Sequence, residues 1–522
     1  MRIGVDVGGT NTDAVLMDGD RVIAISKIPT TRDIGAGIEA ALARVLLDSS
    51  TDPRRIRCVM IGTTQFINAF VQARDLTPVG VVRLGAPATL SLPPFTAWPE
   101  VLRNVVDGGH YILPGGFEID GHPISRFDAR AVADAARDLR NRGIFSIAIS
   151  CVSSPANPRM EDEAQDIVRN EIPEAFITLS HEIGRLGLLE RENATIINCS
   201  LCKLAVRVIP AFENALSKLG IHAPLYISQN DGTLKRAADV ISYPVLTFAS
   251  GPTNSIRGSA YLSGERNAIV VDIGGTTTDV GVITNGYPRQ ASGSVEIAGV
   301  STNFRIPDLI TLGLGGGSLV TLSCANPGGK PRPNVGPESV GYELATKALV
   351  FGGDTLTATD IAVAKGTVVV GDAARVNHLN RAMVDEVMNS IHDRLNDAIE
   401  LMKTSAAPCP VVLVGGGSLL VNEPLSGASQ SIIPEYAAVA NAIGAAIGQI
   451  GGETDSVVSF MRDGRDAVIT RFKADACERA VSAGARADTV DVVEIDEIPL
   501  AYMPGDSVRL RVKAVGALDI DR

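Results

Sequence analysis

Two short segments of this chain combine carboxylates, glycines and threonines in the same order, about half the chain apart. Residues 3–16 read IGVDVGGTNTDAVL and residues 269–282 read IVVDIGGTTTDVGV. Each segment has an apolar run before the core D-[VI]-G-G-T-x-T-D and another after it, which predicts a β-hairpin with the polar core at its tip. The repetition predicts a duplicated hairpin whose tip binds a charged ligand.

The residue types at these tips suit phosphate. Paired glycines allow positive φ and close approach of the backbone to a ligand. Successive N–H groups in such a turn form a concavity that binds anions, and threonine hydroxyls add further donors. The residues expected to bind the phosphates of a nucleotide are Gly8, Gly9, Thr10, Asn11, Thr12, Gly274, Gly275, Thr276, Thr277 and Thr278.

A carboxylate precedes each glycine pair. Asp6 and Asp272 would repel phosphate unless a hard cation lay between them, and Mg²⁺ binds carboxylates, water and phosphate oxygens together. We therefore expect Asp6 and Asp272 to hold Mg²⁺. Asp13 and Asp279 follow the turns and either orient these groups or cap the hairpins. The candidate catalytic set is Asp6, Asp272, Thr10 and Thr276.

Two further glycine-rich turns follow apolar runs. The run VVLVGGGS at 411–418 predicts a backbone that lies flat against the nucleoside at Gly415, Gly416, Gly417 and Ser418, or a tight strand-to-helix turn. The run LGLGGGS at 312–318 predicts that Gly315, Gly316 and Gly317 offer N–H donors near the transferred phosphate, or that they form a crowded crossing of two segments.

Composition favours a compact α/β enzyme. The chain has 522 residues, 45% of them hydrophobic, and a mean hydropathy of +0.18. A net charge of −12 gives no basic surface for nucleic acid or anionic membrane. No apolar run reaches membrane-span length and no secretory signal is evident, so a cytoplasmic location is expected.

The cysteines and histidines predict neither a disulfide framework nor a transition-metal site. The seven cysteines are an odd number, and Cys199 and Cys202 form an isolated C-x-x-C in an apolar stretch that predicts a buried helix. The six histidines lack metal-ligand spacing.

Strand and helix patterns alternate along the chain, as in α/β folds. We expect an N-terminal domain over 1–176 with the first hairpin, a second domain over 177–452 with the second hairpin and the nucleoside-side turn, and a small α+β region over 453–522. The strand SVRLRVKAV near 507–515 alternates apolar and basic residues, which predicts a half-exposed edge strand. The loops at 85–125 and 325–345 are expected to select the substrate.

The ordered motifs resemble the hydantoinase A/5-oxoprolinase family, within the superfamily of actin, Hsp70 and sugar-kinase ATPases. The motifs that carry the resemblance are VDVGGTNTDAVL, IGTTQFINA, SHEIGRLGLLERENATIINCSL, SGPTNS, VDIGGTTTDVGVI, LGLGGGSLV and IPLAYMPGDSVRLRVKAVG. The resemblance implies two duplicated ribonuclease-H-like domains around a nucleotide cleft, plus a small C-terminal α+β cap. Ile61 and Ile310 stand where members of the family commonly carry histidine, so the resemblance does not fix the substrate to the family's named activities.

The resemblance implies ATP-dependent ring opening of a cyclic amide, such as a hydantoin, lactam or 5-oxoproline, with this chain phosphorylating the amide carbonyl oxygen. It implies ATP and Mg²⁺ as cofactors and a hydantoinase B-like second subunit as partner, and it leaves open whether carboxylation replaces hydrolysis. It also places Glu190, Arg191 and Glu192 near the substrate, where a surface charge cluster is the alternative. Two other functions remain open: a small-molecule or sugar-type kinase, and an actin-like ATPase that serves reactivation or assembly.

Overall fold

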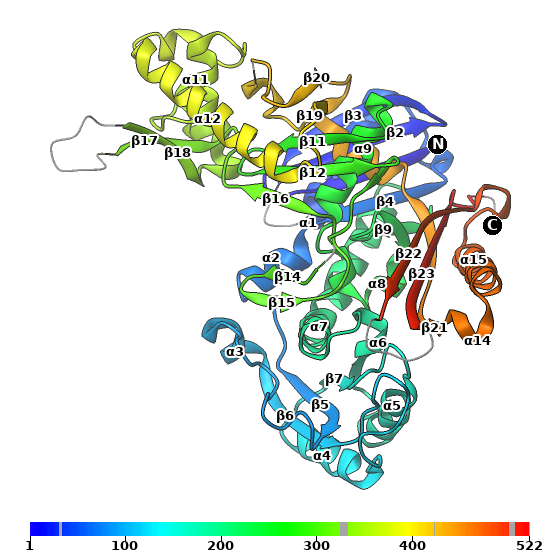
Figure 1. Cartoon of the computed structure of the whole chain (residues 1–522). Helices are drawn as coiled ribbons and strands as arrows, with labels where there is room; N and C mark the ends of the chain where they lie inside the picture. The colour runs from blue at the N-terminus through cyan, green and yellow to red at the C-terminus, as the bar shows by residue number, and fades with distance from the viewer. Residues whose placement is uncertain (31–33, 292, 324–331, 422, 501–506, 521–522) are drawn as a thin grey trace.

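The computed structural model of the chain describes residues 1–30, 34–291, 293–323, 332–421, 423–500 and 507–520. Two mixed sheets lie near one end of the molecule, and a smaller parallel sheet lies at the other end (Figure 1). Helices pack between and around these sheets, as expected when each sheet must bury its apolar faces.

The largest sheet joins strands from both ends of the chain. Within the described ranges its order is β22-β23-β21-β10-β9-β4-β1-β2-β3. Its strands are β1 (Arg2–Val7), β2 (Asn11–Asp18), β3 (Arg21–Pro29), β4 (Cys58–Thr63), β9 (Leu225–Ser228), β10 (Thr233–Arg236), β21 (Gln449–Ser459), β22 (Asp491–Pro499) and β23 (Ser507–Gly516). The first hairpin is β1–β2, and β4 runs parallel to the other edge of β1.

The second sheet repeats this arrangement. Strand β12 pairs antiparallel with β11, and β19 runs parallel to the other edge of β11. The strands of this sheet are β11 (Ala268–Ile273), β12 (Thr278–Thr284), β13 (Tyr287–Pro288), β16 (Leu309–Leu312), β19 (Cys409–Val414) and β20 (Ala428–Ile432). Because the two hairpins share their geometry and their place in the sheet, the predicted duplication of ribonuclease-H-like units is confirmed.

Helices α9 and α13 pack directly between the two sheets. A Cβ atom at Gly258 would lie 1.9 Å from the carbonyl oxygen of Ala440, and one at Gly444 would lie 1.8 Å from that of Asn254. Only glycine allows the two helices to approach this closely. The helices of this part are α1 (Ile34–Ser49), α2 (Gln65–Val71), α8 (Ala237–Val240), α9 (Ser250–Ser263), α10 (Leu344–Lys347), α11 (Ala358–Lys365), α12 (Arg381–Met402) and α13 (Ala440–Ala446).

The smaller sheet is parallel and has the order β6-β5-β7-β8. Its strands are β5 (Val79–Ala86), β6 (Asp107–Pro114), β7 (Ser146–Cys151) and β8 (Phe176–Leu179), and the nearby helices are α3 (Glu100–Val106), α4 (Ala129–Asn141), α5 (Arg159–Glu171) and α6 (Ser180–Ile183). The buried faces of α4 and α5 pack on this sheet around Val132, Leu139 and Ala164.

Helix α7 (Leu188–Lys218) is the long core helix of the molecule. By length and composition it could cross a membrane, but 72% of its most apolar 18-residue window is buried inside the protein. Cys199 and Cys202 are buried on this helix, which confirms the predicted buried C-x-x-C helix.

The small C-terminal α+β region is continuous with the first sheet. Strands β21, β23 and β22 extend the first sheet, with α14 (Phe460–Asp463) and α15 (Arg465–Ser482) packed against them. Strand β23 lies between β21 and β22 and is buried along most of its length, so the predicted half-exposed edge strand is wrong. Its basic side chains are covered by acidic residues of the neighbouring segments, which alternation alone does not reveal.

Two other expectations from the sequence change with the structure. The sheets do not follow the boundaries expected at 176 and 452, because the first sheet takes strands from all three expected segments. Part of the loop expected at 325–345 is a strand, β18 (Arg332–Ser339), which pairs with β17 (Ser318–Ser323); residues 324–331 lie outside the described part.

A short hairpin of β14 (Val295–Ile297) and β15 (Val300–Thr302) packs near α7.

Candidate functional site

The tips of the two repeated hairpins face each other across a cavity. A Cβ atom at Gly275 would lie 3.0 Å from the Thr10 methyl group, so the tips are in contact. The cavity beside this contact has a volume of about 400 Å³. Among the predicted residues, those that line it are Gly8, Gly9, Thr10, Asn11, Asp13, Asp272, Gly274, Gly275, Thr276, Thr277, Gly415 and Gly416.

Three carboxylates lie at or near this cavity: Asp272 lines it and is half-buried, Asp13 lines it and is buried, and Asp6 is buried close to both but is not among the lining residues. Burial, together with the charges of Asp13 and Asp272, raises the pKa of Asp6 to about 7, although the side-chain amides of Asn441 and Asn254 oppose this rise. The Asn441 amide donates to Asp6 Oδ2 at 2.9 Å, whereas Oδ1 has no hydrogen-bond partner among the described residues. Burial also raises the pKa of Asp272, against a hydrogen bond from Ser255.

The chemistry of these carboxylates fits a magnesium ion. A buried carboxylate oxygen without a donor, close to other carboxylates, is costly unless a cation or a proton compensates it. Hard oxygen ligands from one or two carboxylates, completed by water and phosphate, are what Mg²⁺ prefers. Asp6 and Asp272 would hold the ion.

Lys27 is a cation in this cavity that the sequence analysis missed. Its ammonium donates to both oxygens of Asp13 at 2.9 Å and to the carbonyl oxygen of Ala438 at 3.1 Å. Lys27 lies on β3, directly opposite Asp13 of β2. The strand pattern that follows the first hairpin was the sequence feature that could have identified it. Asp13 therefore orients Lys27, while Asp279 accepts from Thr311 at 2.6 Å.

A second, more apolar cavity of about 280 Å³ adjoins the first. The two share Thr10, Asn11, Lys27, Gly274, Gly275 and Gly416. Gly416 and Gly417 lie along its wall, as expected for the nucleoside side, whereas Ser418 is buried and does not line it. Its apolar lining suits an adenine ring, and it consists of Leu344, Phe351, Ala362, Val368, Val370 and Leu420.

The Gly315-Gly316-Gly317 turn is a crowded crossing. The N–H of Gly316 donates to the carbonyl oxygen of Gly274 at 3.0 Å, and that of Gly317 donates to Gly275 at 2.7 Å. The N–H of Gly315 donates to Ser318 Oγ at 2.8 Å. All three N–H groups are therefore occupied, which corrects the expectation that they bind phosphate; the turn supports the second hairpin from behind.

Two predicted hydroxyls turn away from the cavity. Thr278 Oγ1 donates to the carbonyl oxygen of Leu314 at 2.7 Å, and Thr12 Oγ1 lies 3.5 Å from Thr30 Oγ1. Both threonines are buried in strands. Because alternate residues of a strand point to opposite faces, their side chains lie on the face away from the cavity.

Arg191 and Glu192 belong to the core, so a surface charge cluster at 190–192 is excluded. Glu192 accepts from Arg83 Nε at 2.7 Å and from Ser150 Oγ at 2.6 Å, and both members of this ion pair are buried. Arg191 donates to backbone carbonyl oxygens and to Ser180. Neither residue lines the cavity between the hairpin tips.

Two duplicated ribonuclease-H-like units around a shared phosphate-sized cavity define the actin-like ATPase class of fold. The chain matches the hydantoinase/oxoprolinase N-terminal region over residues 2–172 and the hydantoinase/oxoprolinase region over residues 191–407. It belongs to the hydantoinase/oxoprolinase family.

Named relatives in this family include enzyme subunits of two kinds. The caprolactamase subunit alpha of Pseudomonas jessenii is 27% identical over 430 residues, which cover 76% of this chain and 59% of the relative. The acetophenone carboxylase gamma subunit of Aromatoleum aromaticum is 28% identical over 400 residues, which cover 70% of this chain and 53% of the relative. This chain thus spans little more than half the length of these relatives.

Two solved structures share the fold over nearly the whole chain. The ATP-dependent caprolactamase from Pseudomonas jessenii superimposes with a TM-score of 0.76 at 19% identity, covering 99% of this chain and 88% of that chain. The nucleotide-free acetone carboxylase superimposes with a TM-score of 0.72 at 18% identity, covering 100% of this chain and 88% of that chain.

Proposed function

We propose that this chain uses ATP to open a cyclic amide by phosphorylating the amide carbonyl oxygen. The observation that carries the proposal is the cavity between the two hairpin tips, where phosphate-binding backbone, hydroxyls and buried carboxylates converge. The names of the relatives, an ATP-dependent caprolactamase and a 5-oxoprolinase, support an amide or lactam as the substrate class.

The chemistry required is activation of an unreactive carbonyl group. Resonance makes an amide carbon a poor electrophile, and transfer of the γ-phosphoryl group to the carbonyl oxygen converts that oxygen into part of a leaving group. The bond from the γ-phosphorus to the bridging oxygen breaks and ADP leaves. Water then adds to the activated carbon, and the ring C–N bond breaks as the nitrogen takes up a proton, which leaves an acyl phosphate. A second water hydrolyses the acyl phosphate to the carboxylate and inorganic phosphate. Such a transfer depends mostly on positioning and charge neutralisation.

The residues of this chain supply that positioning. The backbone N–H groups at 9–11 and 275–277 bind the phosphate chain, with Thr10 and Thr276 donating hydroxyl hydrogen bonds, while the N–H groups of Gly8 and Gly274 close the two turns on the carbonyl oxygens of Asn11 and Thr277. Lys27, oriented by Asp13, places a positive charge beside it. When Mg²⁺ is bound by Asp6 and Asp272, it neutralises negative charge on the phosphate oxygens. The apolar cavity beyond Gly416 excludes water from the adenine side.

We also propose that a hydantoinase B-like subunit completes the hydrolysis. Several relatives are named as alpha, beta or gamma subunits, which supports an assembly of unlike chains. A cytoplasmic location is part of the same proposal.

ADP release against a panel of lactams, hydantoins and imides, with and without a co-encoded second subunit, tests the proposal. We expect one ring class to stimulate ADP release and the second subunit to convert that ring to the open acid. A phosphorylated product that persists in the presence of the second subunit would indicate a kinase. ADP release that no ring stimulates would indicate an ATPase of the assembly type.

The substitution Asp272→Asn tests the metal ligand separately. We expect ADP release to fall by about 100-fold or more, with unchanged circular dichroism. Asp308→Asn is the matched control, because Asp308 pairs with Arg289 and does not line the cavity. Wild-type turnover by Asp272→Asn would contradict the assignment.

A further inference from the structure

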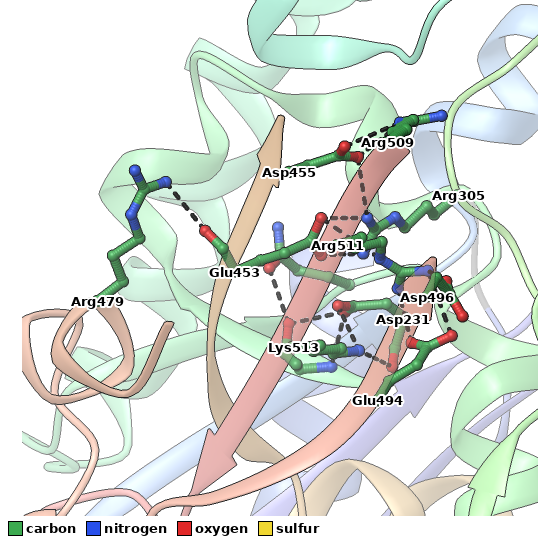
Figure 2. Close-up of polar contacts among 12 residues, drawn as sticks. Asp231, Arg305, Glu453, Asp455, Arg479, Glu494, Asp496, Arg509, Arg511 and Lys513 are labelled. Atoms are coloured by element: carbon green, nitrogen blue, oxygen red, sulfur yellow. Dashed lines mark hydrogen bonds and ion pairs between the residues drawn. The ribbon is translucent and has the colours of Figure 1, made fainter. Parts of the chain in front are cut away.

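Strand β23 carries three basic residues on one face, in the interior of the molecule. Arg509, Arg511 and Lys513 alternate along the strand, and their side chains are only 13%, 7% and 7% exposed. Figure 2 shows acidic side chains of β21, of β22 and of Asp231 pointing toward this face. Basic groups are buried this deeply only when they are paired.

Each carboxylate of this cluster has a basic partner. Asp231 pairs with Lys513 at 2.7 Å, and Asp455 accepts from Arg509 Nε at 2.8 Å. Glu453 accepts both Nη groups of Arg305. Glu494 and Asp496 each accept from Arg511 at 2.7 Å. All five carboxylates of the cluster are therefore already paired, with Arg511 shared between Glu494 and Asp496 (Figure 2).

Arg185 differs from these residues because its guanidinium has no ion pair within the described part of the chain. It lies just after α6 and lines both cavities that flank the cluster. Burial lowers the pKa of Arg185, and the nearby charges of Arg511 and Arg509 also lower it, while the charges of Asp455 and Asp496 oppose this fall. Arg185 is half-buried, and a guanidinium whose donors have no fixed partner is available to bind an anion that enters the cavity.

His181 presents a second polar group to the same space. Its Nδ1 lies 2.7 Å from Oε2 of the fully buried Glu161, and Glu161 also accepts from Ser180 Oγ at 2.5 Å. A carboxylate fixed on Nδ1 orients the ring and leaves Nε2 for another partner. Nε2 has one described carboxylate nearby, the half-exposed Asp162 at 3.9 Å.

The cavity that joins these groups has a volume of about 500 Å³, enough for a small organic molecule. Leu246, Phe304, Ile183 and Pro158 give it an apolar wall opposite the charged one. It shares no lining residue with the cavity between the hairpin tips, so it is a separate space.

We propose that this cavity is a second ligand site, which binds a small monocarboxylate with an apolar or ring-shaped body. Arg185 pairs with the carboxylate through its planar fork of donors, His181 lies within the same pocket as a second polar contact, and the apolar wall packs against the body. A single negative charge compensates Arg185. A doubly charged phosphate would add a second negative charge beside Glu453 and Asp455.

Benzoate and benzamide test this site, since they have nearly the same shape and differ in charge. Titration calorimetry on the full chain without nucleotide should show saturable benzoate binding, about tenfold or more tighter than benzamide binding. Arg185→Met should weaken benzoate binding by about the same factor. Arg465→Met is the matched control, because Arg465 pairs with Glu497 and does not line this cavity.

Three results would overturn the proposal: equal binding of benzamide, wild-type binding by Arg185→Met, or inorganic phosphate displacing benzoate at equal concentration. Asp272→Asn should retain benzoate binding, which separates this site from the proposed ATP-dependent activity. A crystal of the unaltered chain soaked with 4-bromobenzoate tests the location without any variant. The bromine signal should lie in this cavity, and a signal confined to other places would also refute the proposal.

Discussion

Burial of the Asp6 carboxylate costs free energy unless a bound cation or a proton compensates its charge. It is buried at 4% exposure, one of its oxygens has no hydrogen-bond partner in the described ranges, and two further carboxylates lie close enough to raise its pKa. A folded protein tolerates such a group at a functional site, where binding energy compensates it.

The substitution Asp6→Asn is expected to separate stability from activity. ADP release should fall by about 100-fold or more. The midpoint of thermal unfolding should stay the same or rise, because the amide removes like-charge repulsion at the same shape. Thermal denaturation and a coupled ADP assay measure the two effects. Asp48→Asn, at an exposed aspartate of α1, should change neither; a large loss of stability in Asp6→Asn would show a structural role instead.

Position 415 requires glycine for two reasons: its backbone conformation and the close approach of a neighbouring side chain. Its φ is +83°, and an added Cβ atom would lie 2.3 Å from Asp272 Oδ1. Gly366 has a similar φ of +86° but no atom within 4 Å of the added Cβ position. The two glycines therefore share the backbone requirement and differ only in the contact.

Alanine at each of these positions distinguishes strain from contact. Gly366→Ala should lower the free energy of unfolding by about 1–2 kcal/mol through backbone strain, and Gly415→Ala should lower it by more, because its Cβ atom would also lie 2.4 Å from the carbonyl oxygen of Ile273. Gly415→Ala should also displace Asp272 and weaken nucleotide binding by about tenfold, while Gly366→Ala should bind as the unaltered chain does. Calorimetric titration with a non-hydrolysable ATP analogue, alongside denaturant unfolding, measures both quantities.

At the scale of elements, the pattern of local motifs predicted the hairpins but not the pairing of distant charges. The repeated D-x-G-G-T core fixed the position of both hairpins, because turn chemistry and strand alternation act within about ten residues. The strand that carries Arg509 and Arg511 was predicted to be an exposed edge. The acidic partners of these residues lie on β21 and β22, and no local sequence pattern indicates that pairing. Lys27 was missed for the same reason, although it lies only one hairpin strand away from Asp13.

The buried pair of Arg83 on β5 and Glu192 on α7 joins the smaller sheet to the core helix. We expect Arg83→Met to lower the free energy of unfolding by about 3–5 kcal/mol, because it leaves Glu192 buried without its ion-pair partner. Urea unfolding measures the loss. The double variant Arg83→Met with Glu192→Leu should recover part of it, and a fully additive double variant would show that the two side chains do not interact.

The thiols of the core elements should resist alkylation. Burial raises the pKa of Cys58 to about 11 and that of Cys151 and Cys199 to about 12, so very little thiolate forms near neutral pH. In the folded chain these three cysteines should react with iodoacetamide far more slowly than in denaturant, where all seven should react. Peptide mass mapping of the modified sites checks this, and rapid native labelling of Cys199 would contradict the burial of α7.

At the scale of the whole molecule, the two ends of the chain form one sheet. Ala480, Ala485 and Leu518 from the C-terminal part pack against Met60 and Tyr226 of the first lobe. A chain that stops after Gly452 should therefore lose cooperative unfolding and aggregate, because it exposes this apolar surface. Size-exclusion chromatography and thermal denaturation measure the result, and a monomeric, cooperatively unfolding fragment would restore the separable cap expected from the sequence.

The contact between Thr10 and Gly275 also limits how the two halves of the molecule can move. A Cβ atom at residue 275 would lie closer to Thr10 than ordinary van der Waals contact, so only a residue without a side chain lets the two tips approach this closely. Gly275 thus sets how closely the two hairpin tips approach each other, because it has no side chain. A methyl group at residue 275 would push against Thr10 and widen the gap between the two tips that line the proposed phosphate cavity.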